Sequence, residues 1–350
     1  MEPRLSLRDL SHEQILKLQA DHEGSIIFPN VSPKDLGGWK KKHPQVIEST
    51  KIRHEYNFLT GSLVIKCMPM ATHDSLQTFF NGTVLLSLSE KFGMSQTLSL
   101  VTVGSGTSDW TGSSEKLPDA YVKLPGAEFP SVVCEAGWAE GHEELMNDAR
   151  LWLLHTDGQT RIVLVVSFTE NTLKHSLQAA NEEPEEEVRP HGSTSEEETV
   201  VDSIDGATNL NDLANNLMDL NRRDKLRQPL VGNLSATLHV YRANEDGRDI
   251  VQSFEATLLP QPVVDGGGPK EFGITMEELL GDSVPEGQDP GDRIMFCLEN
   301  LRDFIRRSIP DTERVRATRR AKKLLRMAGV WEEEETFAQS KRRCRNPPGA

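Results

Sequence analysis

Residues 117–138 read LPDAYVKLPGAEFPSVVCEAGW and contain two short segments rich in β-forming residues, 119–124 and 131–136. Asp119 opens the first segment, and Glu135 follows Val-Val-Cys inside the second. Side chains alternate between the two faces of a strand, so each acid has a defined side. If the two strands are neighbours, the carboxylates of Asp119 and Glu135 meet over one face of a sheet.

The segments around this stretch alternate between strand and helix patterns. On its N-terminal side, 62–68 predicts a strand, 72–92 predicts a helix from apolar residues three and four apart, and 97–103 predicts a strand. On its C-terminal side, 142–155 predicts a second helix, and the apolar β-branched run 161–169 predicts a strand covered on both faces. The order helix, three strands, helix, strand indicates a mixed α/β sheet.

A carboxylate inside an apolar strand, as at Glu135, requires a partner, because an isolated buried charge is costly. A metal ion, a buried Lys or Arg, or solvent at the strand end would each serve. Two converging carboxylates suit a hard cation such as Mg²⁺ or Mn²⁺, which phosphodiester hydrolysis uses. The residues alone leave the structural and the metal-binding interpretations open.

Three motifs carry a resemblance to a known family: LPDAYV at 117–122, FPSVVCEAG at 129–137 and DARLW at 148–152. Together they resemble the PD-(D/E)XK restriction-endonuclease-like superfamily, in particular its uncharacterised fungal members. The resemblance covers residues 60–170. It implies a restriction-endonuclease-like core in which Asp119 and Glu135 bind Mg²⁺ or Mn²⁺ and act on DNA or RNA.

The sequence departs from the family pattern at one position. The family's lysine stands two residues after the second acid, where this chain has Gly137. Lys123, on the same side of its strand as Asp119, is a candidate replacement, and His73 is a candidate metal ligand or a helix-cap or surface histidine. Two functions therefore remain open: a metal-dependent nuclease, and a catalytically inactive copy of the fold that binds protein or nucleic acid.

Composition and pattern divide the chain into five expected parts. Residues 1–59 hold a helix (11–20) and an irregular extension (28–44), and residues 60–175 form the core. Residues 176–207 are an acidic disordered insert. Residues 208–270 hold an amphipathic helix (208–227) and a β-hairpin (234–242 and 250–259), a candidate extension of the core, and residues 271–350 form a helical basic region with helices at 293–308 and 312–328.

Charge is distributed unevenly along the sequence. The net charge is −15, but residues 302–350 contain fourteen Lys and Arg against seven acids, whereas 181–202 contain nine acids against one arginine. The basic clusters at 314–326 and 341–345 fit a nuclear-import signal, a nucleic-acid contact or a solvated helix face. The net charge of the whole chain therefore does not give the sign of the charge on each binding surface.

Several classes of protein are not indicated. No apolar run approaches the roughly 20 residues of a bilayer span, and residues 1–21 lack the apolar centre of a secretory signal. The four cysteines are scattered without C-x-x-C spacing, and neither a G-x-S-x-G nor an H-E-x-x-H motif occurs. We expect an intracellular protein, nuclear rather than cytoplasmic, without a membrane partner, while a protein partner stays open.

Overall fold

The computed structural model describes residues 7, 10–15, 25–44, 53–66, 71–105, 108–109, 114–138, 142–171, 204, 208–261 and 268–330. The chain divides into two compact units. Unit 1 comprises Met1–Asn171 and Asn233–Thr312, and unit 2 comprises Thr172–Gly232 and Glu313–Ala350. Apart from Ile204, the predicted acidic insert at 176–207 lies outside the described residues.

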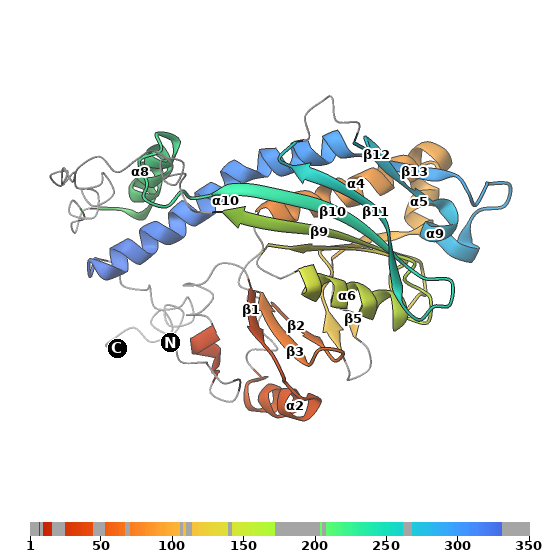
Figure 1. The fold of residues 1–350 in the computed structure, drawn as a ribbon, viewed down its shortest axis with the longest axis horizontal. Helices are drawn as coiled ribbons and strands as arrows, with labels where there is room; N and C mark the ends of the chain where they lie inside the picture. The colour runs from red at the N-terminus through yellow and green to blue at the C-terminus, as the bar shows by residue number, and fades with distance from the viewer. Residues whose placement is uncertain are drawn as a thin grey trace, which may run out of the picture. The chain divides into compact units, whose positions relative to one another are not determined.

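A six-stranded sheet forms the centre of unit 1, with the strand order β11-β10-β9-β8-β7-β4 (Figure 1). Its strands are β4 (Thr102–Gly104), β7 (Ala120–Lys123), β8 (Val132–Gly137), β9 (Ile162–Asn171), β10 (Asn233–Ala243) and β11 (Ile250–Leu259). β8 and β9 are parallel, and the other neighbouring pairs are antiparallel. The predicted mixed α/β sheet is confirmed, and the predicted hairpin extends it.

Helices cover both faces of this sheet (Figure 1). α4 (Ala71–Phe92) packs on one face, in a cluster that includes Val122 and Cys134. α6 (His142–Leu154) connects β8 to β9, as a parallel pair requires, and packs on the other face in a cluster that includes Val133. Both predicted core helices are confirmed, and odd-numbered residues of β8 point toward α6.

A second, five-stranded sheet belongs to the same unit and has the order β1-β3-β2-β6-β5. Its strands are β1 (Ser25–Phe28), β2 (Arg53–Asn57), β3 (Ser62–Lys66), β5 (Ser108–Asp109) and β6 (Glu115–Lys116). The predicted strand at 62–68 is therefore present as β3, but in this sheet. β6 lies only a few residues before β7 in the sequence, so the chain passes directly from one sheet to the other.

The irregular extension predicted for 28–44 is wrong, because α2 (Pro33–Lys42) occupies most of it. Ser32 caps this helix: its side chain accepts a hydrogen bond from the backbone N–H of Asp35, and a proline follows at the first helical position. Leu36 and Trp39 lie three residues apart and are buried. Of the predicted helix at 11–20, residues 12–15 are helical and 16–20 lie outside the described part.

The strand predicted for 97–103 is also wrong in its first half, where α5 (Met94–Leu100) precedes β4. Gly93 ends α4 in the left-handed region, with φ of 77°, and caps α5. The Thr97 hydroxyl donates to the carbonyl of Gly93. These local bonds outweigh the β-branched residues in the segment.

The two helices predicted for 293–308 and 312–328 are corrected as well. β13 (Arg293–Cys297) pairs with β12 (Glu271–Thr275) in a two-stranded sheet. A single helix, α10 (Leu298–Met327), then continues through Pro310. Hydroxyl groups on both sides of the proline, those of Ser308 and Thr312, contact Thr72 of α4, which holds the two turns in place. Between β12 and β13 lie α9 (Met276–Leu280) and η3 (Gly281–Ser283).

Unit 2 contains α8 (Leu210–Arg222), which confirms the predicted amphipathic helix, and residues 313–327 of α10. Asn209 caps α8 by accepting a hydrogen bond from the N–H of Asp212. Buried leucines of α8 share one apolar cluster with alanines of α10. Over the described residues of both units, no helix has the length and apolar character needed to cross a membrane.

Candidate functional site

Asp119 and Glu135 lie on the same face of the six-stranded sheet. β7 and β8 pair antiparallel with Ala120 opposite Cys134, so extending the register by one residue places Asp119 opposite Glu135. Ala120 and Cys134 pack in the cluster on the α4 side. The two acids therefore point to the α6 side, because side chains alternate along each strand.

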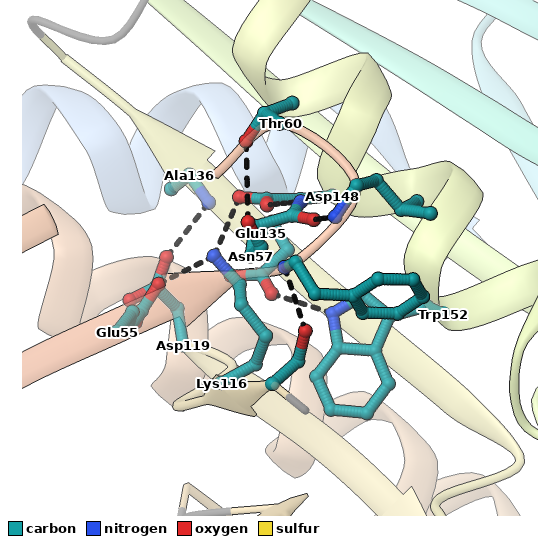
Figure 2. Close-up of polar contacts among 12 residues, drawn as sticks. Glu55, Asn57, Thr60, Lys116, Asp119, Glu135, Ala136, Asp148 and Trp152 are labelled. Carbon is teal, nitrogen blue, oxygen red and sulfur yellow. Dashed lines mark hydrogen bonds and ion pairs between the residues drawn. The ribbon is translucent and has the colours of Figure 1, made fainter. Parts of the chain in front are cut away.

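Each of these carboxylates accepts a hydrogen bond from a fixed donor (Figure 2). Oδ2 of Asp119 accepts from the backbone N–H of Ala136 at 2.7 Å, and Oε1 of Glu135 accepts from the indole N–H of Trp152 at 2.8 Å. Glu135 is only 3% exposed. Burial raises the pKa of the Cys134 thiol well above its usual value, and the nearby charges of Asp119 and Glu135 raise it further.

A buried lysine belongs to the same group of side chains (Figure 2). Nζ of Lys116 lies 2.5 Å from Oε2 of Glu55 and 2.6 Å from Oδ2 of Asp148. The amide of Asn57 donates to the other oxygen of Asp148 at 2.9 Å. Charge-assisted bonds between groups as buried as these fix their positions strongly. The two sheets and α6 thus meet at one polar cluster inside unit 1.

The local sequence explains how these side chains are positioned. Asp148 lies on the buried stripe of α6, three residues after Leu145 and four before Trp152, so it faces the sheet. A small pocket opens beside it. The pocket is lined by Glu55, Asn57, Thr60, Ser62, Val64, Lys116, Glu144, Asn147 and Asp148. The pocket therefore reaches the part of the cluster that holds Glu55, Lys116 and Asp148, whereas Asp119 and Glu135 are not among its lining residues.

The structure does not bring Lys123 to this cluster. Its Nζ donates to the backbone carbonyl of Glu128 at 2.8 Å, beyond the opposite end of β7 from Asp119. Lys116 is the lysine that lies with the carboxylates instead. The backbone of His73 lies in the first turn of α4, but its side chain is outside the described part of the structure.

Gly137, in the position of the family's lysine, is a packing residue. A Cβ atom built there would lie 2.6 Å from Cδ1 of Leu145. That separation is shorter than carbon atoms tolerate, so any side chain at this position requires Leu145 to move. The glycine allows α6 to pack closely on the end of β8, so a lysine near the two acids has to come from another element.

The donor set determines which metal ions suit the site. Within the ranges that the structure describes, no three His, Cys, Asp or Glu side chains are arranged to hold a metal ion together. Mg²⁺ is commonly held by one or two carboxylates, with waters and substrate phosphates as its other ligands. Asp119 and Glu135 supply two carboxylates, the number that such a site uses, but Glu135 is buried and neither residue lines the pocket.

Sequence reasoning missed Lys116, Glu55, Asn57 and Asp148. Asp148 carried a signal, because a carboxylate on the apolar stripe of a helix is costly to bury without a partner. Lys116 stands directly before the LPD motif, but a single lysine at the end of a two-residue strand has no distinguishing pattern. Glu55 and Asn57 come from a sheet that the sequence did not predict beyond β3.

No protein-family model matches the sequence, and no curated protein matches it. The functional assignment therefore depends on the geometry of the polar cluster.

Proposed function

We propose that unit 1 is a divergent restriction-endonuclease-like core that hydrolyses phosphodiester bonds in DNA or RNA with Mg²⁺ or Mn²⁺. The observation that carries the proposal is the pairing of Asp119 and Glu135 on one face of neighbouring strands, with the buried Lys116 in the same cluster. Once α5, β5 and β6 are set aside, the elements from α4 to β9 also follow the order that the resemblance implies.

Asp119 and Glu135 would hold the cation, and their hydrogen bonds from Ala136 and Trp152 keep both carboxylates in place before substrate arrives. The chemistry that Mg²⁺ or Mn²⁺ would supply here, held by Asp119 and Glu135, is Lewis-acid activation of water and of the phosphate. Lys116 takes the role first considered for Lys123. Its ammonium would orient a phosphate oxygen or the water, held in place by its carboxylate partners.

A second function is favoured by a specific observation. Lys116 is already ion-paired with Glu55 and Asp148, and Leu145 fills the space beside Gly137. A cluster closed in this way stabilises the fold without performing chemistry. The alternative proposal is therefore a catalytically inactive copy of the fold, retained as a module that binds protein or nucleic acid.

Metal-dependent cleavage distinguishes the two. Purified protein is titrated with Mg²⁺ or Mn²⁺ in the presence of plasmid and single-stranded substrates. We expect cleavage by the wild type and loss of cleavage in Glu135→Gln and Asp119→Asn, whereas Glu143→Gln on the exposed side of α6 keeps it. Equal cleavage by all variants would indicate a contaminating nuclease. No cleavage by any of them, with all proteins folded, would leave the binding module as the function.

A further inference from the structure

The described part of unit 2 is strongly basic. Residues 208–232 and 313–330 contain eleven Lys and Arg against four Asp and Glu, in a chain whose net charge is −15. Seven of the eleven lie on the C-terminal half of α10, between Arg314 and Arg326. A positive charge this dense, on one helix of an acidic protein, points to a negatively charged ligand.

The basic residues of α10 lie on the face opposite its apolar stripe. Ala317, Ala321 and Leu325 are buried in one cluster with Leu213 and Leu217 of α8. The following residues fall on the other side of the helix at 3.6 residues per turn: Arg319, Lys322, Lys323 and Arg326. α8 thus covers the apolar side of α10 and leaves its basic side directed away from the cluster.

Two further arginines fix this arrangement within unit 2. Nη1 of Arg316 donates to the carbonyl of Leu230 at 2.8 Å, and Nη1 of Arg320 donates to the carbonyl of Gln228 at 3.0 Å. Both bonds tie α10 to the segment that follows α8. The face that carries Lys322 and Lys323 is therefore supported by a packed helix pair and by arginine contacts to the backbone.

We infer that this basic face of α10 binds the phosphate backbone of nucleic acid. From Arg319 to Arg326 the helix rises about 10 Å, which matches about three base-pair steps of a duplex. Clustered Lys and Arg on one helix face neutralise phosphates without reading bases. The binding surface would serve either proposed function of unit 1, and it does not depend on hydrolysis.

Nucleic acid fits this face better than an anionic membrane does. A helix that lies on a membrane inserts its apolar side among the lipid chains. The apolar stripe of α10 at Ala317, Ala321 and Leu325 is instead buried against α8. The side directed away from that cluster carries the charges, with one exposed apolar residue, Met327, at the end of the helix. A phosphate backbone is a polyanion that such charges can hold.

The test measures binding without cleavage. Anisotropy of a fluorescent DNA duplex, and of a single strand, is recorded with the full chain in EDTA from about 50 to 200 mM salt. The test variant carries Lys322→Gln and Lys323→Gln, since glutamine keeps a good helix propensity. The matched control carries Lys34→Gln and Lys41→Gln at two exposed lysines of α2, and circular dichroism checks that both remain folded.

We expect the slope of log affinity against log salt to become shallower by about 2 in the test variant, one unit for each lost phosphate contact, and to stay unchanged in the control. EDTA removes divalent cations, so the measurement reports binding without hydrolysis, and a failure of the hydrolysis proposal leaves this result intact. An unchanged slope in the test variant would overturn the inference, as would binding to phosphatidylserine vesicles with none to DNA.

Discussion

Nζ of Lys116 lies 2.6 Å from Oδ2 of Asp148, although the two residues are 32 positions apart and belong to a short strand and a helix on different parts of the fold. Their side chains are 3% and 11% exposed. Since Lys116 also contacts Glu55, one ammonium joins the five-stranded sheet to α6. The stability of unit 1 and the geometry of its candidate site therefore depend on the same contact.

Replacing Lys116 tests that dependence. Lys116→Met leaves the buried carboxylates of Glu55 and Asp148 facing each other without the ammonium, and we expect a loss of about 3–5 kcal/mol in the free energy of unfolding. Urea denaturation measures the loss. Lys123→Met is the matched control, because its ammonium contacts only an exposed carbonyl among the bonds described here, and it should change stability by less than about 1 kcal/mol. Equal stability of the two variants would contradict the prediction.

The indole of Trp152 provides a second test. Trp152→Phe keeps most of the apolar packing but removes the N–H that Glu135 accepts, in a site closed to solvent. We expect a cost of about 1–3 kcal/mol in thermal or urea unfolding. Trp138→Phe is the comparison, since the indole of Trp138 donates to the partly exposed Glu170. A loss at Trp138 as large as that at Trp152 would show that burial of the carboxylate does not set the cost.

Packing at Gly137 predicts a coupled pair of substitutions. Gly137→Ala should destabilise the protein by about 1–3 kcal/mol, because the new methyl group meets Leu145 at 2.6 Å. Combined with Leu145→Ala, the total loss should be smaller than the sum of the two single losses. Gly82→Ala in α4, where a Cβ meets nothing within 4 Å, should instead stabilise by about 0.5–1 kcal/mol. If the losses in the free energy of unfolding for Gly137→Ala and Leu145→Ala add up in the double variant, the close contact between these residues is contradicted.

Glu115 makes the folding stability of the protein depend on pH in the acidic range. Its contact with His54 and the ammonium of Lys40 lower its pKa from 4.5 to about 2, against the opposing effect of burial. Because the folded state holds this group ionised, its contribution to stability is complete above pH 4.5 and is lost as the pH falls toward 2. In thermal unfolding, the advantage of wild type over Glu115→Gln should therefore shrink across this window. A constant difference would refute the assignment, and Glu143→Gln serves as the control for losing a carboxylate.

Local periodicity was enough to predict the elements that flank the site. The apolar run of β9 and the helical spacing of α6 depend on neighbours a few residues away, so the sequence records them directly. The same holds for Asp119, directly before β7, and for Glu135, within the apolar β8, because these two strands pair with each other. The convergence of these two acids on one face could therefore be predicted from the sequence.

The lysine could not be predicted in the same way. Lys116 meets Glu55 and Asp148 only after three elements distant in sequence have packed together, and no spacing rule connects positions 55, 116 and 148. The wrong predictions for α2 and α10 had a related cause. Pro33 and Pro310 suggest breaks when read alone, but the first stands where a helix begins and the second is held by contacts with Thr72.

Residues 172–232, the larger of the two segments of unit 2, lie in the sequence between β9 and β10, two neighbouring strands of the larger sheet of unit 1. Asn171, the last residue of β9, pairs directly with Asn233, the first residue of β10. Residues 172–232 thus leave and re-enter at adjacent positions, as a hairpin turn would, and their length can vary without shifting the register of either strand. A shortened chain with a tight turn at this junction, ending near Thr312, would retain every strand of the larger sheet. Replacing residues 172–232 with a tight turn would therefore leave the pairing of β9 with β10 unchanged.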